Sequence, residues 1–450
     1  MGANGAARPT GVSVDTRRLR AGDVFFAIRG ERTDGHQYVG EALSRGACAA
    51  VVRADCLVEG WQAGLIVVDD TVQALGRAAK GYRGLFGGPV VCITGSSGKT
   101  TTKEMTALTL SPLGPVAKSV GNYNNEIGLP LSVFGLGPAH RSAVFELAMR
   151  GCGQIQYLAQ IAQPRVGVIV NVGSAHLELL GSQKAVAEAK AELLEELPGD
   201  GTAVLPADSR WFDELARRCR CGQVISFGLS DRADVRIVGY AEADGGCSFT
   251  VEVGGAGYEI TLCAPGQHLA LDAAAALAAA WAVGVDPAEA ADALRSFSPP
   301  DMRGTVLRSA KGFTVVNDAY NANPDSMAAA LRSLRARPGG PVALLGCMAE
   351  LGESSEEHHK AVGALAAELG LRLLVVVGPL GAWIAQGARE AGMAEDAVLE
   401  FDEPEAAGRY LREVLGPGDV VLVKASRAAK LERAVAALLG PCEGEAACRW

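Results

Sequence analysis

The chain has 450 residues, enough for two or three domains. Hydrophobic residues make up 49% of it and charged residues 21%, which is the composition of a globular protein with an ordinary core. The formal net charge of -9 and the lack of a long basic run argue against nonspecific nucleic-acid binding, because such binding needs a cationic surface.

The chain carries no predicted targeting or membrane segment. Its first 20 residues contain no apolar signal core. The longest apolar stretch, 264–285, is interrupted by Gln267, His268 and Asp272, which predicts a buried alanine-rich helix and not a membrane span. The 11 cysteines have no regular spacing, so we expect free thiols in a reducing compartment. These features predict a soluble cytoplasmic protein.

Residues 1–87 form the first predicted domain. Their short apolar runs at 24–28, 49–52 and 65–68 indicate strands among short helices. Gly87-Gly88-Pro89 marks a linker at its end.

The second predicted domain is 88–299. Apolar strands are expected at 90–93, 143–145 and 166–170, with helices beginning near Lys99 and over 183–197. This alternation indicates a parallel sheet with helices on both faces.

Residues 298–300 (Ser-Pro-Pro) mark the second boundary, and 300–450 form the third predicted domain. Strand-like runs recur there with helical stretches between them, at 313–316, 342–345, 373–377 and 420–423. This pattern indicates a second doubly wound, Rossmann-like unit. The predicted fold class is therefore α/β with three domains, and we expect ligands in the clefts between them.

The strongest motif is the phosphate-binding loop 94–101 (TGSSGKTT), which follows an apolar strand and opens a helix. Its glycines let the backbone wrap a phosphate, and the helix N-terminus offers N–H groups and a positive dipole end. Lys99 can reach the β- and γ-phosphates, and the Thr100 hydroxyl can bind Mg²⁺. A GTPase is a poor alternative, since the chain has no Asn-Lys-x-Asp guanine motif.

Three further side chains are candidates for metal binding or catalysis. Glu146 follows an apolar strand, at the edge where ligands bind in parallel sheets. His176 lies in a loop of small residues after another strand. Lys190 falls on the apolar stripe of the helix over 183–197, where a lysine needs a partner, a modification or a snorkelling side chain. The asparagines of the polar segment 121–128 could donate to a diphosphate or a sugar, or act as turn residues.

These motifs together resemble the Mur ligase family. The shared segments, in the family's order, are 94–101 (TGSSGKTT), 121–128 (GNYNNEIG), Glu146, 171–176 (NVGSAH) and 189–192 (AKAE). Segments similar to those of the branch that adds D-alanyl-D-alanine are 13–17, 22–27, 30–36, 317–326 (NDAYNANPDS), 346–352 (GCMAELG) and 421–427 (VLVKASR).

The resemblance implies a small N-terminal UDP-binding domain, a central P-loop ATPase-like domain and a C-terminal domain that closes the site. It implies ATP-dependent joining of UDP-N-acetylmuramoyl-tripeptide to D-alanyl-D-alanine through an acyl phosphate, in peptidoglycan synthesis. It also implies two Mg²⁺ ions, a carbamylated Lys190 and a monomer. The implied metal ligands are Thr100, Glu146, His176 and Lys190. The implied catalytic residues are Lys99, Glu146, His176 and Lys190.

The implied binding residues divide into two sets. For the nucleotide they are Thr94, Gly95, Ser96, Ser97, Gly98, Lys99, Thr100, Thr101, Arg303, Asp318 and Asn321. For the UDP substrate they are Thr16, Arg17, Arg32, Thr33, Asp34, Asn122, Asn124, Asn125 and Arg150.

The chain departs from the family pattern where adenine is usually bound. Pro206, Leu269 and Asp272 stand at positions where asparagine is usual. Two alternatives stay open at this point: another amide ligase of this fold, such as a folylpolyglutamate-type enzyme, and a nucleotide-binding paralogue without catalysis. The sequence does not decide whether the tripeptide carries lysine or diaminopimelate.

Overall fold

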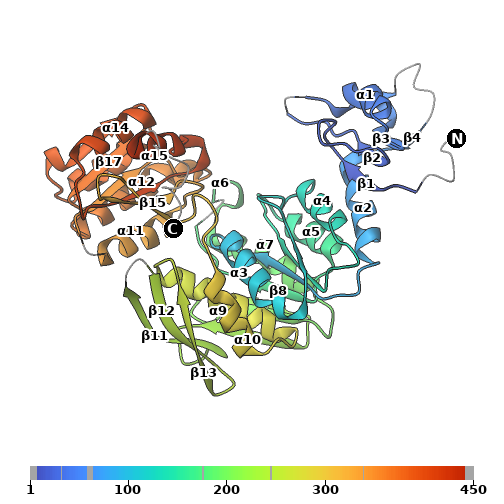
Figure 1. Ribbon diagram of the computed structural model, residues 1–450, viewed down its shortest axis with the longest axis horizontal. Helices are drawn as coiled ribbons and strands as arrows, with labels where there is room; N and C mark the ends of the chain where they lie inside the picture. Colours follow the sequence, from blue (N-terminus) through green and yellow to red (C-terminus); the bar gives the residue numbers. More distant parts are fainter. Residues whose placement is uncertain are drawn as a thin grey trace.

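The computed structural model describes residues 8–31, 33–57, 64–174, 177–243, 246–337 and 339–440. These residues form three lobes in chain order, each built on its own sheet (Figure 1). The predicted α/β class with three sheet-containing regions is confirmed. In the part of the chain that the structure describes, no helix is both long and apolar enough to cross a membrane.

The N-terminal lobe contains a four-stranded parallel sheet in the order β1-β2-β3-β4. Its elements are β1 (Gly11–Ser13), β2 (Asp23–Phe26), η1 (Gly35–Tyr38), α1 (Val39–Ser44), β3 (Ala49–Arg53), η2 (Ala54–Cys56) and β4 (Leu65–Val68).

Helix α2 (Thr71–Arg83) joins this lobe to the next. It begins where the Asp70 carboxylate accepts hydrogen bonds from the backbone N–H groups of Val72 and Gln73. Leu75 packs into the core of the first lobe, and Ala79 packs into the core of the second. The helix therefore belongs to the packing of both lobes.

The central lobe is a nine-stranded sheet in the order β13-β12-β11-β10-β9-β8-β5-β7-β6. Its strands are β5 (Val90–Thr94), β6 (Val116–Lys118), β7 (Ser142–Glu146), β8 (Val166–Ile169), β9 (Thr202–Pro206), β10 (Gln223–Gly228), β11 (Val235–Ala243), β12 (Gly246–Val253) and β13 (Ala256–Leu262). Neighbouring strands from β6 to β11 are parallel, and β11, β12 and β13 form an antiparallel extension.

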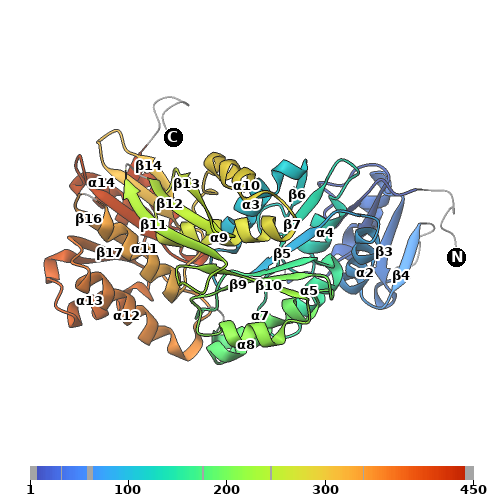
Figure 2. The ribbon, with the colours of Figure 1, turned by 90° about the horizontal axis from the view of Figure 1, so that it is seen from below.

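Helices cover both faces of the central sheet (Figure 2). They are α3 (Lys99–Thr109), α4 (Gly128–Phe134), α5 (Gln154–Ala162), α6 (Leu177–Leu180), α7 (Gln183–Glu195), α8 (Phe212–Arg218), α9 (Gln267–Ala282) and α10 (Pro287–Ala293), with η3 (Ser111–Leu113) and η4 (Leu294–Ser296). Val91 and Ile93 of β5 share a core with α9, whereas Val90 and Cys92 share one with α5 and α7.

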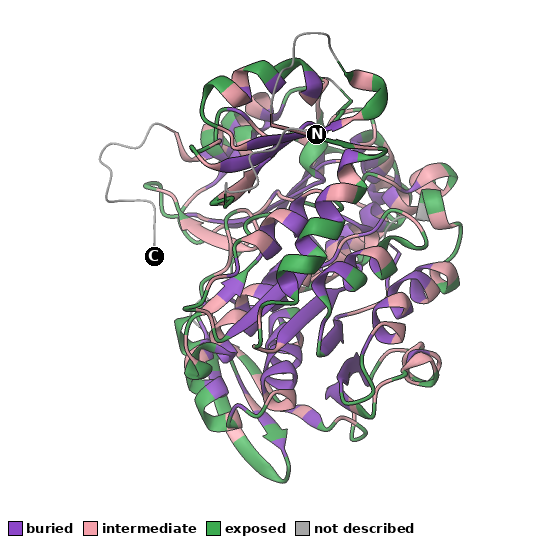
Figure 3. Ribbon diagram, turned by 90° about the vertical axis from the view of Figure 1, so that its right-hand side faces the viewer, coloured by how far each residue is buried: buried purple, intermediate pink, exposed green. Residues whose placement is uncertain are grey.

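This arrangement follows from the sequence pattern. Every residue of β5, β7 and β8 is buried, as expected for strands covered on both faces (Figure 3). The alanines of α9 are also buried, except for the half-buried Ala282 at its end, and their small side chains let the helix lie close to the sheet and to α3. The central core therefore holds the carboxyl ends of β5 and β7 rigidly in place.

The C-terminal lobe is a six-stranded sheet in the order β14-β15-β19-β16-β17-β18, parallel except for β14. Its strands are β14 (Thr305–Arg308), β15 (Thr314–Asp318), β16 (Pro341–Leu345), β17 (Leu373–Val377), β18 (Val398–Phe401) and β19 (Val420–Lys424). Its helices are α11 (Pro324–Ala336), α12 (Ser355–Glu368), α13 (Gly381–Glu390), α14 (Pro404–Val414) and α15 (Glu432–Leu439), with η5 (Gly352–Ser354), η6 (Glu395–Ala397) and η7 (Arg427–Ala429).

Candidate active site

A cavity of about 640 Å³ lies between the central and C-terminal lobes. The central lobe contributes the phosphate loop, Glu146, the segment after β8 and the start of α9 to its wall. The C-terminal lobe contributes the ends of β15 and β19 and one side of α11. Both walls are carboxyl ends of parallel strands, which is where α/β sheets bind ligands.

The phosphate loop connects β5 to α3. Gly98 is the N-cap of α3 with a φ of 77°, and a Cβ there would lie 2.5 Å from Oδ1 of Asp272, so only glycine fits. Lys99 folds back and donates to the carbonyl oxygen of Gly95 at 2.7 Å. Burial lowers the pKa of Lys99, and the charge of Glu146 opposes that shift. The loop thus holds a desolvated cation at the start of a helix, which suits a phosphate.

Asn171, just after β8, orders this loop from outside it. Its Oδ1 accepts from the backbone N–H groups of Ser96 and Ser97, both at 3.0 Å. Its Nδ2 donates to the hydroxyl of Ser97 at 3.0 Å. Sequence reasoning gave Asn171 no role of its own, because the contact joins residues 74 and 75 positions apart.

Glu146 is the last residue of β7 and is 2% exposed. The hydroxyl of Thr100 donates to Glu146 Oε2 at 2.7 Å, and Nδ2 of Asn124 donates to Oε1 at 2.8 Å. A carboxylate and a hydroxyl beside the phosphate loop are the oxygen ligands that Mg²⁺ prefers. The donor set of this pair therefore fits a magnesium ion.

Lys190 lies on α7 and is 1% exposed. It shares the helix's buried side with Val186 and Leu193, as the stripe predicts. No carboxylate among the described residues lies within ion-pair distance of it, and its side chain does not line the cavity. Burial, assisted by the charge of Lys99, holds its pKa well below the ordinary value. His176 lies outside the described residues.

Three residues of the C-terminal lobe were predicted to bind the nucleotide, and all three line the cavity: Arg303, Asp318 and Asn321. The guanidinium of Arg303 lies 4.1 Å from the ring centroid of Tyr320, and Nζ of Lys424 contacts Asp318 Oδ2 at 2.5 Å. The same lysine donates to the carbonyl oxygen of Asn321 at 3.0 Å. Lys424 is 3% exposed, and sequence reasoning missed it as a site residue, although a lysine directly after an apolar strand was a usable signal.

Asp272, Leu269 and Pro206, which stand where the family usually has asparagine, all line the same cavity. Asp272 is 4% exposed, and its Oδ1 accepts from the Thr102 hydroxyl at 3.1 Å. Burial raises its pKa to about 8, against the opposing effects of that hydrogen bond and of Arg303. A carboxyl so raised carries a proton at neutral pH, and a protonated carboxyl donates a hydrogen bond as an asparagine does.

Some of the other predicted residues line the cavity and some do not. Asn122 and Asn124 line it. Asn125 does not, and its side-chain Oδ1 accepts a hydrogen bond from the N–H of Gly128 at the start of α4. The side chain of Arg150 is 73% exposed and lies 3.9 Å from Glu350 of the C-terminal lobe. Thr94 is buried under the loop, outside the lining.

The residues predicted to bind uridine belong to the N-terminal lobe, and none of those that the structure describes lines the cavity. Thr16 is buried, and its carbonyl oxygen accepts from Arg45 at 2.9 Å. Arg17 is exposed and pairs with Asp15 at 2.7 Å. Thr33 is exposed, and Arg32 lies outside the described residues.

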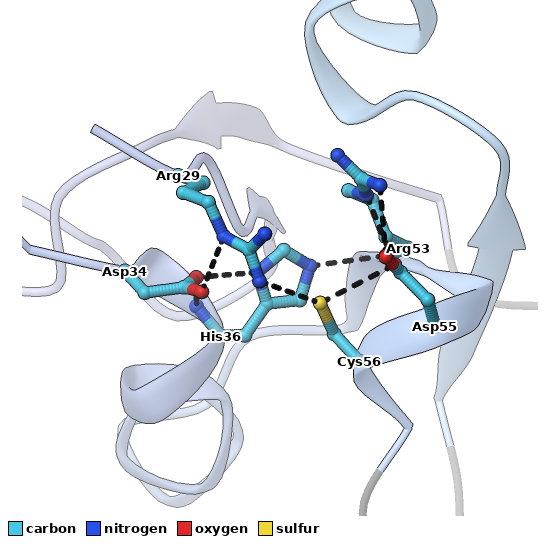
Figure 4. Close-up of polar contacts among 6 residues, drawn as sticks. All are labelled: Arg29, Asp34, His36, Arg53, Asp55 and Cys56. Carbon is cyan, nitrogen blue, oxygen red and sulfur yellow. Dashed lines mark hydrogen bonds and ion pairs between the residues drawn. The ribbon is translucent and has the colours of Figure 1, made fainter. Parts of the chain in front are cut away.

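Asp34 belongs to a network that has the residue types of a metal site (Figure 4). Nε2 of His36 accepts from the backbone N–H of Arg53 at 3.0 Å, so the ring proton sits on Nδ1, which donates to Asp34 at 2.6 Å. Arg29 also pairs with Asp34 at 2.8 Å and contacts the Cys56 sulfur at 3.4 Å. Both ring nitrogens of His36 are used in hydrogen bonds, and the Arg29 guanidinium pairs with the same carboxylate, so these contacts order the loop.

Three sequence profiles match the chain. They are the Mur ligase family catalytic domain over residues 8–83, the Mur ligase middle domain over 93–280 and the Mur ligase glutamate ligase domain over 302–427. The chain is 35% identical to the UDP-N-acetylmuramoyl-tripeptide--D-alanyl-D-alanine ligase of Bacillus subtilis, over 95% of this chain and 93% of the relative. It is 38% identical to the Synechocystis protein of the same name, over 96% and 92%. The chain belongs to the Mur ligase family.

Solved structures agree with this assignment. MurF from Acinetobacter baumannii has a TM-score of 0.88 and 30% identity, covering 95% of this chain and 93% of that one. MurF from Thermotoga maritima in complex with ADP has a TM-score of 0.84 and 32% identity, covering 96% and 97%. A Mycobacterium tuberculosis folylpolyglutamate synthase, at 16% identity and a TM-score of 0.65, shares only the fold.

Proposed function

We propose that the chain is an ATP-dependent ligase that joins UDP-N-acetylmuramoyl-tripeptide to D-alanyl-D-alanine in peptidoglycan synthesis. The observation that carries the proposal is one cavity lined by a phosphate loop, a buried Thr100–Glu146 pair and the closing face of the C-terminal lobe. The relatives named for this reaction match nearly the whole chain.

The chemistry has two steps. A carboxylate oxygen of the tripeptide attacks the γ-phosphorus of ATP, and ADP leaves to give an acyl phosphate. The amine of D-alanyl-D-alanine then attacks the acyl carbon, phosphate leaves, and the nitrogen gives up a proton. Because two anions meet in the first step, the barrier depends on cationic groups placed in advance.

Lys99 is the residue we assign to the γ-phosphate. Among the described residues, its ammonium makes a hydrogen bond with the loop carbonyl of Gly95 alone, so it can turn to a phosphate oxygen at little cost. Asn171 holds the loop, and Arg303 adds positive charge from the C-terminal side of the cavity. These groups offset the charge of the phosphates while the two lobes exclude water that would hydrolyse the acyl phosphate.

Magnesium would be held by Thr100 and Glu146, whose oxygens are already paired. When bound, it would screen the β- and γ-phosphate charges. Asn124 donates to the other carboxylate oxygen of Glu146 and so fixes the orientation of the carboxylate. His176 and Lys190 are proposed for a second ion.

Lys190 is proposed to be carbamylated. Its depressed pKa favours a neutral amine, which attacks CO₂ through its nitrogen lone pair and then loses a proton. The product is an anion with oxygen ligands, which explains a lysine buried without a carboxylate partner in the described part of the chain.

The N-terminal lobe is proposed to hold the UDP moiety, through Thr16, Arg17, Arg32, Thr33 and Asp34, with Asn122, Asn125 and Arg150 nearer the peptide. We place the domain limits at 1–87, 88–299 and 300–450. The C-terminal domain is proposed to bind the incoming dipeptide. A monomer is proposed because the cavity is lined by two lobes of one chain. The nine cysteines in the described ranges are unpaired, in keeping with a cytoplasmic location.

The test is a product assay with purified protein, UDP-muramoyl-tripeptide, ATP, Mg²⁺ and D-alanyl-D-alanine. ADP release and the pentapeptide product are expected in equal amounts. Single amino acids, including glutamate, replace the dipeptide in parallel reactions, and tripeptides ending in lysine and in diaminopimelate are compared. Product only with glutamate would favour a folylpolyglutamate-type ligase, and nucleotide binding with no product would favour a non-catalytic protein.

A further inference from the structure

The start of α11 reaches from the C-terminal lobe to the phosphate loop. Oδ1 of Asn323 caps the helix by accepting from the N–H of Ser326 at 2.9 Å, and Ser326 Oγ accepts from the N–H of Asn323 at 3.0 Å. The free amide group of the same side chain, Nδ2, donates to the carbonyl oxygen of Ser96 at 3.3 Å, in a buried contact. One side chain thus contacts a helix of one lobe and the nucleotide loop of the other.

Asp325, two residues after Asn323, makes a second contact of this kind. Its Oδ2 accepts from the backbone N–H of Ser174, in the loop after β8, at 2.7 Å. The preceding residue, Gly173, donates its own N–H to the hydroxyl of Ser96 at 2.9 Å. A Cβ on Gly173 would lie 2.3 Å from Asp325 Oδ2, so the approach also requires glycine. The α11 start, the loop after β8 and the phosphate loop therefore form one connected network.

This network holds the peptide group between Ser96 and Ser97 in the phosphate loop. Its carbonyl oxygen accepts from Asn323, and its N–H donates to Asn171 at 3.0 Å. A trans peptide is planar, with its C=O and N–H pointing to opposite sides. The two bonds therefore hold this peptide plane from both sides, one from each lobe. Its orientation is fully fixed only while the C-terminal lobe is in place.

We propose that Asn323 and Asp325 are positioning residues, which lock the phosphate loop and the loop after β8 into their working shape when the C-terminal lobe closes. The inference rests on the proposed ligase function and names how closure acts on that site. Neither residue needs to touch the reacting atoms, because each acts through a backbone group of the central lobe.

Two variants separate this role from helix capping. Asn323→Ser keeps a good N-cap oxygen but is too short to reach Ser96. Asp325→Ala removes the acceptor for Ser174 and leaves the cap. Asp286→Ala is the matched control, because Asp286 caps α10, away from the cavity, by accepting from the N–H of Ala288 at 2.7 Å.

Asn323→Ser and Asp325→Ala are each expected to lower kcat about 10–100-fold, as for a lost hydrogen bond with a buried or charged partner. KM for the UDP substrate should stay within about 2-fold, because that substrate is assigned to the N-terminal lobe. Melting temperature should fall no further in these two variants than in Asp286→Ala, which should lower melting temperature but not kcat. Wild-type kcat in both variants, or a loss that merely follows melting temperature, would overturn the proposal.

Small-angle X-ray scattering with ADP and Mg²⁺ gives a readout that needs no ligation. The wild type is expected to be more compact than either variant under these conditions, because the interlobe bonds favour closure. Equal radii of gyration for all three proteins would refute the positioning role. If the wild type shows the radius difference but makes no product, the proposed function fails and the positioning role stands.

Discussion

Asp272 allows a quantitative test of how burial controls ionisation beside the phosphate loop. The perturbation is Asp272→Asn, which has the shape of the protonated acid and keeps an oxygen for the Thr102 hydroxyl. In the wild type, burial raises the pKa from 3.8 to about 8. The folded protein therefore holds this proton over a pH range in which the unfolded chain has lost it.

The sign of the effect follows from that difference. A carboxyl whose pKa is raised by folding contributes its full stability below about pH 4, the pKa of the unfolded chain. That contribution falls as pH rises toward the folded pKa and levels off above it. With 1.36 kcal/mol per pKa unit, the loss is about 2–3 kcal/mol between pH 5 and pH 7. Asparagine does not titrate, so the variant should not show this loss.

The assay is thermal unfolding of wild type and Asp272→Asn from pH 5 to pH 9. The melting temperature of the variant relative to the wild type should rise with pH by roughly 1 °C for each kcal/mol, and this difference should stop growing above about pH 8. ADP binding gives a second measurement, because an ionised carboxylate beside the loop repels phosphate. Wild-type affinity should fall about 10-fold from pH 7 to pH 9 relative to the variant. A difference between the two proteins that does not change with pH would refute the reasoning.

Substitutions at three other places test the proposed sites. Lys99→Ala should lower kcat by about 10²–10³-fold or more with an unchanged circular dichroism spectrum, and near wild-type ligation would remove the lysine from the mechanism. Lys190→Ala should lose most activity yet still bind ADP, and acetate should restore part of the activity. Lys190→Arg should stay inactive, so full activity of Lys190→Arg would exclude a carbamate. Thr33→Ala with Asp34→Ala should raise KM for the UDP substrate and leave KM for ATP nearly unchanged, and the reverse pattern would show that the lobes are misassigned.

Local sequence determined the elements that hold the site. Continuous apolar runs predicted β5, β7 and β8, and β17 begins and ends where the run 373–377 does. The glycine-rich segment after β5 predicted the phosphate loop, and Glu146 is the last residue of its strand, as expected. These features depend on backbone conformation and burial over a few residues, which a periodic pattern records directly.

The partners of these residues were decided only by the tertiary structure. Asn171 meets the phosphate loop, Lys424 meets Asp318, and Asn323 meets Ser96 across 74 to 227 positions of sequence. The antiparallel extension of β11 to β13 was also not predicted, although the alternation of buried and exposed residues along β12 follows a period-two sequence pattern that is typical of a half-buried strand. A local pattern reports which face of an element is buried, but not which distant group meets it. That choice is made when helices and sheets pack, and in this chain it places the residues of the C-terminal lobe on the nucleotide loop.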